Sequence, residues 1–299
     1  MCIVAKEVTL DPRLVKLTTR TNTEVRRSLP HRELTMIGAW CFVDHYGPTN
    51  SPDAMSIAQH PHVGLQTVSW LFEGEIEHRD SLESVQLINP GQLNLMTSGI
   101  GIAHSELSLK VEKNLHGVQL WIALPFKFKD VSPHFEHHGE LPNLEYQGLK
   151  VKVIMGSLLG KTSSAKTYTP IVGAEISGND LDLELPVDEK FEYGILVDAG
   201  EIEVNGHKVE TNQLHYMPAG FNSISLKSKG EFRGLLIGGE PFGEEIIMWW
   251  NFIGRSHQEI VKMREDWENG SDRFASFIDN IGGRIPAPAM PNVLLKPRK

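Results

Sequence analysis

The chain has 299 residues and a formal net charge of −9 at pH 7, with 40% hydrophobic and 22% charged residues. This composition is typical of a globular protein with one large domain or two of ordinary size. The acidic balance and the lack of a long Lys/Arg run argue against direct nucleic-acid binding. No stretch approaches the roughly 18 uninterrupted apolar residues of a membrane-spanning helix, so no membrane partner is expected.

The cysteine content and the N-terminus bear on the compartment. Cys2 and Cys41 give no disulfide framework, which favours a reducing environment. The first apolar run is too short for a secretory signal. The sequence therefore predicts a cytoplasmic protein.

Short strands separated by turns predict an all-β first half. Residues 64–74 form a β-branched and aromatic run, and residues 118–124 form an almost continuous apolar one. Asn89-Pro90-Gly91 is a strong turn signal between them. Gly99 and Gly101 predict a bend or a close backbone approach. Many short strands with frequent turns are typical of a β-barrel or sandwich.

Two pairs of metal-capable side chains lie within this β pattern. His60 and His62 form one pair and His104 and Glu106 the other, each at spacing i and i+2. Successive side chains alternate faces on a strand, so both members of a pair project the same way. Two such strands in one small barrel would bring three imidazoles and one carboxylate together. This donor set suits a first-row transition metal and leaves positions open for other ligands.

A second histidine-rich segment lies further along the chain. Residues 126–150 are polar and rich in turn signals, and they contain His134, His137 and His138. No strand pattern holds these three side chains in place. We expect the segment to be a solvated linker whose histidines bind no metal.

The second half, residues 151–240, loosely repeats the strand and turn pattern of the first. Residues 193–206 predict a hairpin closed by Asn205-Gly206. This half contains only His207 and His215, which are not spaced as an i, i+2 pair. The pattern indicates an internal duplication whose second copy lacks a comparable metal site.

The C-terminal residues change to a helical pattern. Ser256 and Glu259 form a capping box. Ile260 and Trp267 follow at helical spacing, and Gly270 is a C-terminal stop signal. The sequence predicts one helix that docks on a β domain, followed by extended segments.

Seven short motifs occur in a fixed order along the chain: His60–Val68, Glu73-Gly74, His78–Ser81, Asn89–Gly91, Gly99–Glu106, His116–Trp121 and Gly238–Pro241. Their order and spacing resemble those of the pirin family, within the cupin superfamily. The resemblance covers most of the chain and is densest between positions 60 and 125. It implies two tandem cupin-type β-barrel domains, the first of which holds a metal ion. Together with the strand pattern it predicts a metal-binding barrel over residues 1–140, a second barrel without metal ligands over 150–245, and a helical and extended tail over 246–299.

The resemblance also implies a ligand set and a metal. Carried over position by position, the ligands are His60, His62, His104 and Glu106, and the ion is Fe(II), with other first-row metals as alternatives. Gln66 stands where the family often has a glutamate. A neutral amide cannot supply charge or act as a base. This chain therefore offers no second carboxylate at that position.

Two functions follow from the resemblance, and a third reading needs no chemistry. The first is a metal-dependent dioxygenase that cleaves a flavonol such as quercetin with O2, with Glu106 as the catalytic proton acceptor. The alternative is a metal- or redox-responsive regulatory protein that binds a transcription factor or a metabolic enzyme. The third is a β scaffold that a metal ion merely stabilises. Catalytic oxygen uptake with a flavonol distinguishes the first from the other two.

Overall fold

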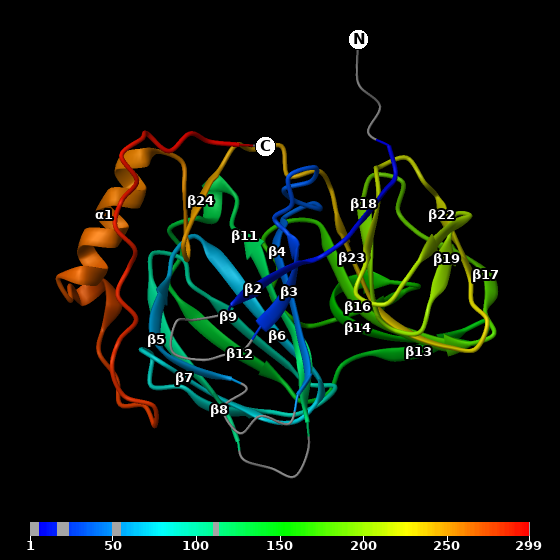
Figure 1. Ribbon diagram of the computed structural model, residues 1–299, viewed down its shortest axis with the longest axis horizontal. Coiled ribbons are helices and arrows are strands. Elements are labelled where there is room, and N and C mark those ends of the chain that lie inside the picture. The colour runs from blue at the N-terminus through cyan, green and yellow to red at the C-terminus, as the bar shows by residue number, and fades with distance from the viewer. Residues whose placement is uncertain (1–5, 17–23, 50–54, 110–113, 299) are drawn as a thin grey trace. The chain divides into compact units, whose positions relative to one another are not determined.

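The chain folds into two compact units of β structure (Figure 1). The structure, a computed structural model, describes residues 6–16, 24–49, 55–109 and 114–298. The unit that we call the 45–139 unit contains residues 15–25, 45–139 and 243–299. The other, the 140–242 unit, contains residues 1–14, 26–44 and 140–242. The predicted all-β class is confirmed, whereas the consecutive domain boundaries stay a prediction.

The 140–242 unit consists of two antiparallel sheets. The larger has the order β1 (Val8–Leu10), β21 (Leu214–Met217), β18 (Glu192–Ala199), β23 (Glu231–Gly239), β16 (Ile171–Asn179), β14 (Leu149–Leu158) and β13 (Asn143–Tyr146), with β15 (Lys161–Thr162) on β14. The smaller has the order β17 (Asp182–Pro186), β22 (Ser223–Lys227), β19 (Ile202–Val204) and β20 (His207–Val209).

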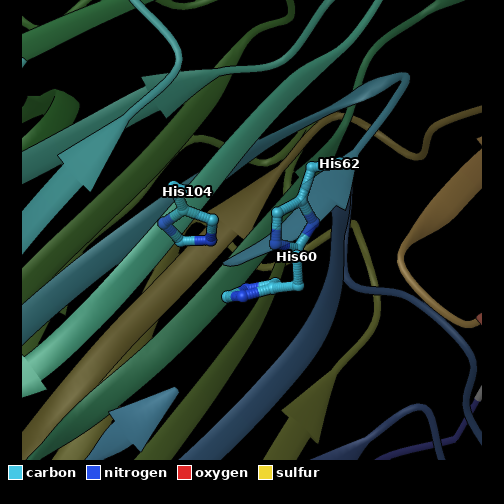
Figure 2. Close-up of side chains that lie close together, drawn as sticks. All are labelled: His60, His62 and His104. Carbon is cyan, nitrogen blue, oxygen red and sulfur yellow. The ribbon is translucent and has the colours of Figure 1, made fainter. Parts of the chain in front are cut away.

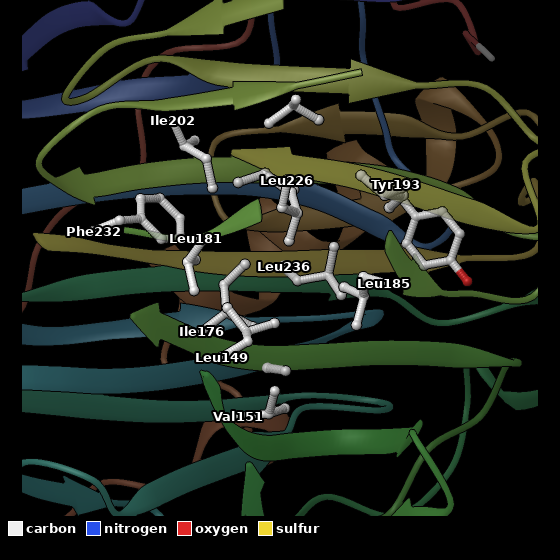
Figure 3. Packing of buried hydrophobic residues seen from close by; sticks show 14 of the residues in the cluster. Leu149, Val151, Ile176, Leu181, Leu185, Tyr193, Ile202, Leu226, Phe232 and Leu236 are labelled. Atoms are coloured by element: carbon white, nitrogen blue, oxygen red, sulfur yellow. The ribbon is translucent and has the colours of Figure 1, made fainter. Parts of the chain in front are cut away.

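Alternating side chains build the core of this unit. In β17, Leu183 and Leu185 are buried whereas Asp182 and Glu184 are exposed, as expected for a strand with one face in the core. The buried cluster draws side chains from both sheets, as Figure 3 shows. It leaves the interior of the unit apolar.

The turn predicted at Asn205-Gly206 is confirmed, but the hairpin that it closes covers residues 202–209 and not 193–206, because β18 belongs to the larger sheet. β19 and β20 pair antiparallel, and Val204 lies opposite His207. Asn205 and Gly206 have φ angles of 48° and 83°. Positive φ at both central residues is the geometry of the two-residue turns that match the twist of a β-hairpin.

The 45–139 unit also has two main sheets. One has the order β12 (His134–His138), β9 (Leu93–Thr97), β6 (Leu65–Glu73), β11 (Leu115–Ala123), β4 (Trp40–Thr49), β3 (Glu24–Leu29) and β2 (Arg13–Lys16), of which the last three cross the unit boundary along the chain. The other has the order β5 (Ser56–His62), β10 (Ile102–Ser108), β7 (Ile76–Asp80) and β8 (Val85–Ile88). Among the described residues no sheet closes on itself, so the architecture is cupin-like without a fully closed barrel.

The expected linker is partly wrong. Residues 134–138 form β12, which pairs with β9 from His134 opposite Thr97 to His138 opposite Leu93. β12 is an edge strand whose residues are all half-buried, and charged side chains are common on such strands. Its polar composition therefore concealed a strand.

The C-terminal segment, residues 243–299, packs within the 45–139 unit. It contains the short pair β24 (Ile247–Trp249) and β25 (Phe252–Gly254), the helix α1 (His257–Glu268) and the 3-10 turn η2 (Asp272–Phe274); a further 3-10 turn, η1 (Phe126–Phe128), follows β11. Ile260, Met263 and Trp267 of α1 are buried, as their spacing predicts. They share a cluster with Val63 and Ala103, which adjoin the metal-capable pairs on β5 and β10.

Both ends of α1 agree with the sequence. The hydroxyl of Ser256 accepts a hydrogen bond from the backbone N–H of Glu259. At the other end, Gly270 has a φ of 63°, and the N–H groups of Gly270 and Ser271 donate to the carbonyls of Trp267 and Asp266. These two bonds form a Schellman motif, which satisfies carbonyls that the helix leaves unpaired.

Two smaller observations concern membrane-spanning helices and the cysteines. In the part of the chain that the structure describes, no helix combines the length and apolar character needed to cross a membrane. Cys41 is buried as a free thiol, and Cys2 lies outside the described residues.

Replacing Ser256 by alanine should lower the free energy of unfolding by about 1 kcal/mol, because the N–H of Glu259 loses its side-chain acceptor. Denaturant unfolding monitored by tryptophan fluorescence measures the change. Ser256→Thr keeps the hydroxyl and serves as the control. Equal unfolding midpoints for the alanine variant and the wild type would contradict the assigned cap.

Candidate metal centre

Three histidines converge on two paired strands. β5 and β10 run antiparallel, with His104 opposite His60 and Ile102 opposite His62. Side chains that are paired, or two apart on one strand, share a face of the sheet. Figure 2 shows the three imidazoles gathered on that face, with ring centroids between 4.2 and 5.1 Å apart. Their ring nitrogens approach within 4.8 Å of one another.

The unsatisfied nitrogens of these rings indicate where a metal ion fits. His60 Nδ1 hydrogen-bonds the carbonyl of Ala58 at 2.9 Å, which leaves its Nε2 for another partner. His62 bonds the backbone of Asn251, and its buried Nδ1 has no partner among the described residues. The buried Nε2 of His104 has none either. Buried polar atoms are rarely left unpaired in proteins, and metal-ligating histidines use their second nitrogen for such orienting bonds. The three residues therefore fit a bound metal ion.

Glu106 lies beside this cluster on the same strand. The register of β10 against β5 shifts between His104 and Glu106. The Glu106 carboxylate accepts a hydrogen bond from the Ser69 hydroxyl at 3.2 Å. It belongs to a second group of three potential ligands, with His104 and His78. His104 is thus common to both groups, and the four-ligand set stays a prediction.

The backbone before β10 explains the two glycines of this segment. Gly99 has a φ of 46°, and a Cβ there would overlap the carbonyl oxygen of Val131. A Cβ at Gly101 would lie 3.0 Å from side-chain atoms of Arg273 and Phe274. The predicted close approach is confirmed, and it fixes the entry of the chain into β10.

His78 and Asp80 complete the surroundings of the centre from the other side of β10. β7 pairs with β10 so that Asp80 lies opposite His104 and His78 opposite Glu106. Both side chains are buried: 4% of the His78 side chain and 0% of the Asp80 side chain is exposed. The sequence placed them in a motif without assigning a role. Their i, i+2 spacing on a strand, the rule that identified the other two pairs, could have found them.

Burial keeps the imidazoles of the cluster neutral. It lowers the pKa of His60 to about 4, a hydrogen bond to Ala58 opposing the shift. Burial and the neighbouring imidazoles hold the pKa values of His62 and His104 well below the usual range. Metal ions bind the unprotonated nitrogen, so the ligand-competent form is present at neutral pH.

The pKa of the Glu106 carboxyl shifts in the opposite direction. Burial raises its pKa, although His78 and the Ser69 hydroxyl oppose the shift. A buried carboxylate without a cation is disfavoured, and an adjacent metal cation reverses that preference. A cation bound beside Glu106 would therefore stabilise the ionised form of its carboxyl group.

Three other residues that the sequence singled out have hydrogen-bond partners outside the cluster. Gln66 on β6 is fully buried, and its amide donates to the Thr97 hydroxyl at 2.9 Å. His137 hydrogen-bonds Asn94 at 2.7 Å, and His138 contacts Glu136.

The potential ligands of the second half have local partners. His215 hydrogen-bonds Thr9 at 2.8 Å and Glu7 at 3.1 Å, all within the 140–242 unit. Its ring lies 5.1 Å from that of His207. A cavity of about 550 Å³ in this unit is lined by hydroxyl, apolar and aromatic side chains, among them Phe191, and contains no histidine. The lack of a metal site in this half stays a prediction.

Acid should destabilise the metal-free protein through His60. Its pKa is about 4 when folded and 6.5 in the reference state, so below pH 6.5 the unfolded chain binds more protons. The stabilisation is complete above pH 6.5 and is lost as the pH falls toward 4, by roughly 2 kcal/mol between pH 7 and pH 5. Denaturant unfolding of chelator-treated protein measures it. His60→Gln should flatten this dependence by that amount; parallel curves for the two proteins would contradict the assignment.

Comparison with known proteins identifies the family. The pirin family model matches residues 21–122, and the model of the pirin C-terminal cupin domain matches residues 177–275. A Pseudomonas aeruginosa protein, provisionally named a quercetin 2,3-dioxygenase, is 44% identical over 270 residues, which cover 89% of this chain and 86% of the relative. The crystal structure of quercetin 2,3-dioxygenase from Acinetobacter baumannii matches with a TM-score of 0.94 at 40% identity and covers 98% of each chain.

A more distant structure shares the fold alone. The bacterial pirin of Escherichia coli, solved in complex with nickel(II), matches with a TM-score of 0.64 at 18% identity, over 79% of this chain and all of that one. The family models together cover more than half of the chain, and they agree with the close relatives and with the two-domain β architecture. The chain belongs to the pirin family.

Proposed function

We propose that the protein is a metal-dependent dioxygenase that cleaves a flavonol such as quercetin with O2. The observation that carries the proposal is the buried group of His60, His62 and His104, with Glu106 beside it. His62 Nδ1 and His104 Nε2 have no partner among the described residues. The names of the relatives at 40% and 44% identity supply the substrate class.

The four residues would hold the ion through three ring nitrogens and one carboxylate. Fe(II) is the ion we propose, and other first-row metals suit the same donors. When bound, such an ion supplies dioxygen activation and lowers the pKa of a flavonol hydroxyl that coordinates it.

Glu106 is the residue that we assign to proton transfer. A cation in the centre would keep this carboxyl ionised, which is the form that accepts a proton. The Ser69 hydroxyl has one proton and two acceptors within reach, Glu106 at 3.2 Å and Gln119 at 2.9 Å. When Ser69 turns to Gln119, Glu106 loses a hydrogen bond to its charged form and becomes a better proton acceptor.

The wall around the cluster excludes water. Trp121 of β11 places its ring edge-on to His62, with centroids 5.1 Å apart. His60, His62 and His104 are each no more than 7% exposed. Aromatic surroundings of this kind are typical of sites that bind a planar, largely apolar molecule such as a flavonol.

A second candidate is a metal- or redox-responsive regulatory protein. The net charge of −9 favours a protein partner over nucleic acid. This candidate shares the metal centre and predicts metal binding without turnover.

Replacing His62 by alanine or Glu106 by glutamine should deplete the metal. The first change removes a neutral ligand. The second removes the only anion of the set, so it should weaken the binding of a divalent ion more. Metal content after anaerobic purification, by mass spectrometry, is the measurement. His137→Gln, a change remote from the cluster, is the control. Stoichiometric metal in both ligand variants would show that the ligands are misassigned.

Iron-loaded protein should consume oxygen when quercetin is added, and Glu106→Asp should lose more rate than metal. The shorter side chain keeps its charge but withdraws the proton acceptor by about 1 Å, which can cost ~100-fold in rate. An oxygen electrode measures the rate of uptake for the wild type and Glu106→Asp, and the rates are compared at equal metal occupancy. Uptake no greater than a metal-only blank by fully loaded wild type would reject the dioxygenase and leave the regulatory candidate.

A further inference from the structure

A buried chain of polar groups leads away from the metal cluster through the back of His104. His104 Nδ1 lies 3.4 Å from His78 Nδ1. The opposite nitrogen of His78, Nε2, lies 3.0 Å from Asp80 Oδ2. The other oxygen of Asp80 accepts hydrogen bonds from the backbone N–H groups of Leu82 and Ser84, at 2.8 and 3.1 Å.

The ring of His78 is also held from its face. Phe135 of β12 stacks on it, with centroids 4.5 Å apart and planes 15° from parallel. The edge strand that the sequence concealed thus supplies one wall of this chain. With its plane and both nitrogens constrained, His78 has little freedom to rotate.

We propose that His78 and Asp80 are positioning residues that hold His104 in the one tautomer able to bind a metal ion. The proposal rests on the metal centre proposed above. It adds two residues of a third strand, β7, to that centre. Neither residue belongs to the proposed ligand set.

The order of the protons follows from the acceptor at the end of the chain. An ionised carboxylate only accepts hydrogen bonds, so His78 must carry its proton on Nε2 and present a lone pair at Nδ1. His104 then places its own proton on Nδ1, facing that lone pair, and leaves Nε2 unprotonated. This Nε2 is the buried nitrogen without a protein partner. The separation of 3.4 Å is long for a hydrogen bond, and a cation at Nε2 would strengthen the contact by making the Nδ1 proton more acidic.

Asparagine at position 80 should reverse this order. The amide keeps one oxygen, which stays with the two N–H groups of the turn because they outnumber the single N–H of His78. Its NH2 group then faces His78 and requires a lone pair at Nε2. His78 becomes protonated on Nδ1, and His104 must move its proton to Nε2, where the metal ion would bind.

Full-length protein and Co(II), a spectroscopic probe, test the proposal. Dissociation constants from competition with a chelator, and the visible Co(II) spectrum, are measured for the wild type, Asp80→Asn, His78→Leu and His78→Asn. Asp80→Asn and His78→Leu should each weaken Co(II) binding roughly 10- to 100-fold, the usual range for residues that orient metal ligands. In His78→Asn the side-chain oxygen can take the place of Nδ1 as acceptor, so it should restore most of the affinity and the wild-type spectrum.

The double variant tests whether Asp80 acts through His78. In the His78→Leu background Asp80 no longer reaches His104, so adding Asp80→Asn should not weaken Co(II) binding further. Additive losses would show that Asp80 acts on the centre by another route. His137→Gln, which breaks a histidine bond to Asn94 on β9, is the matched control and should bind as the wild type does.

Any of three results would overturn the proposal. Wild-type affinity in Asp80→Asn, or additive losses in the double variant, would reject the positioning role and leave the metal centre intact. A wild-type protein that binds no Co(II) would reject the metal centre and this inference together.

Discussion

The centre depends on the register of β10 against its two neighbours. Side chains alternate along a strand, so a slip of one residue would turn His104 and Glu106 away from His60 and His62. The same slip would move Ala103 out of the apolar cluster under α1. Ligand placement and core packing therefore select the same register, and neither can change alone. This coupling lets a set of buried imidazoles persist in the absence of an ion.

Burial of these imidazoles is costly in the metal-free protein and useful in the loaded one. Desolvation removes their tendency to protonate and leaves two ring nitrogens unpaired. A bound metal ion would satisfy both and would also offset the charge of Glu106. The apolar packing around the strands holds the three imidazoles in this arrangement.

Much of the fold could be predicted from local sequence. The i, i+2 rule found His60 with His62 and His104 with Glu106, because strand geometry alone dictates it. Turn and cap chemistry placed Asn205-Gly206 and the start of α1 for similar reasons.

What local sequence could not supply was pairing between distant strands. β12 has a polar composition because it lies at an edge, which only the sheet order reveals. The role of His78 depends on its position across from Glu106, and on Phe135 above its ring, contacts that no local pattern encodes. The assignment of residues 26–44 to the 140–242 unit is likewise a matter of long-range contacts.

The packing of the C-terminal segment has a consequence for the order of events during synthesis. Val63 and Ala103, next to the candidate ligands, are covered by side chains such as Ile260 and Trp267. When the ribosome has added residue 242, all of the 140–242 unit has been synthesised, whereas the C-terminal segment that contains Ile260 and Trp267 has not. Since domains fold as units while the chain emerges, the later unit in the sequence can finish first. The metal-capable strands, although made early, acquire their final support only after the C-terminal segment has been synthesised.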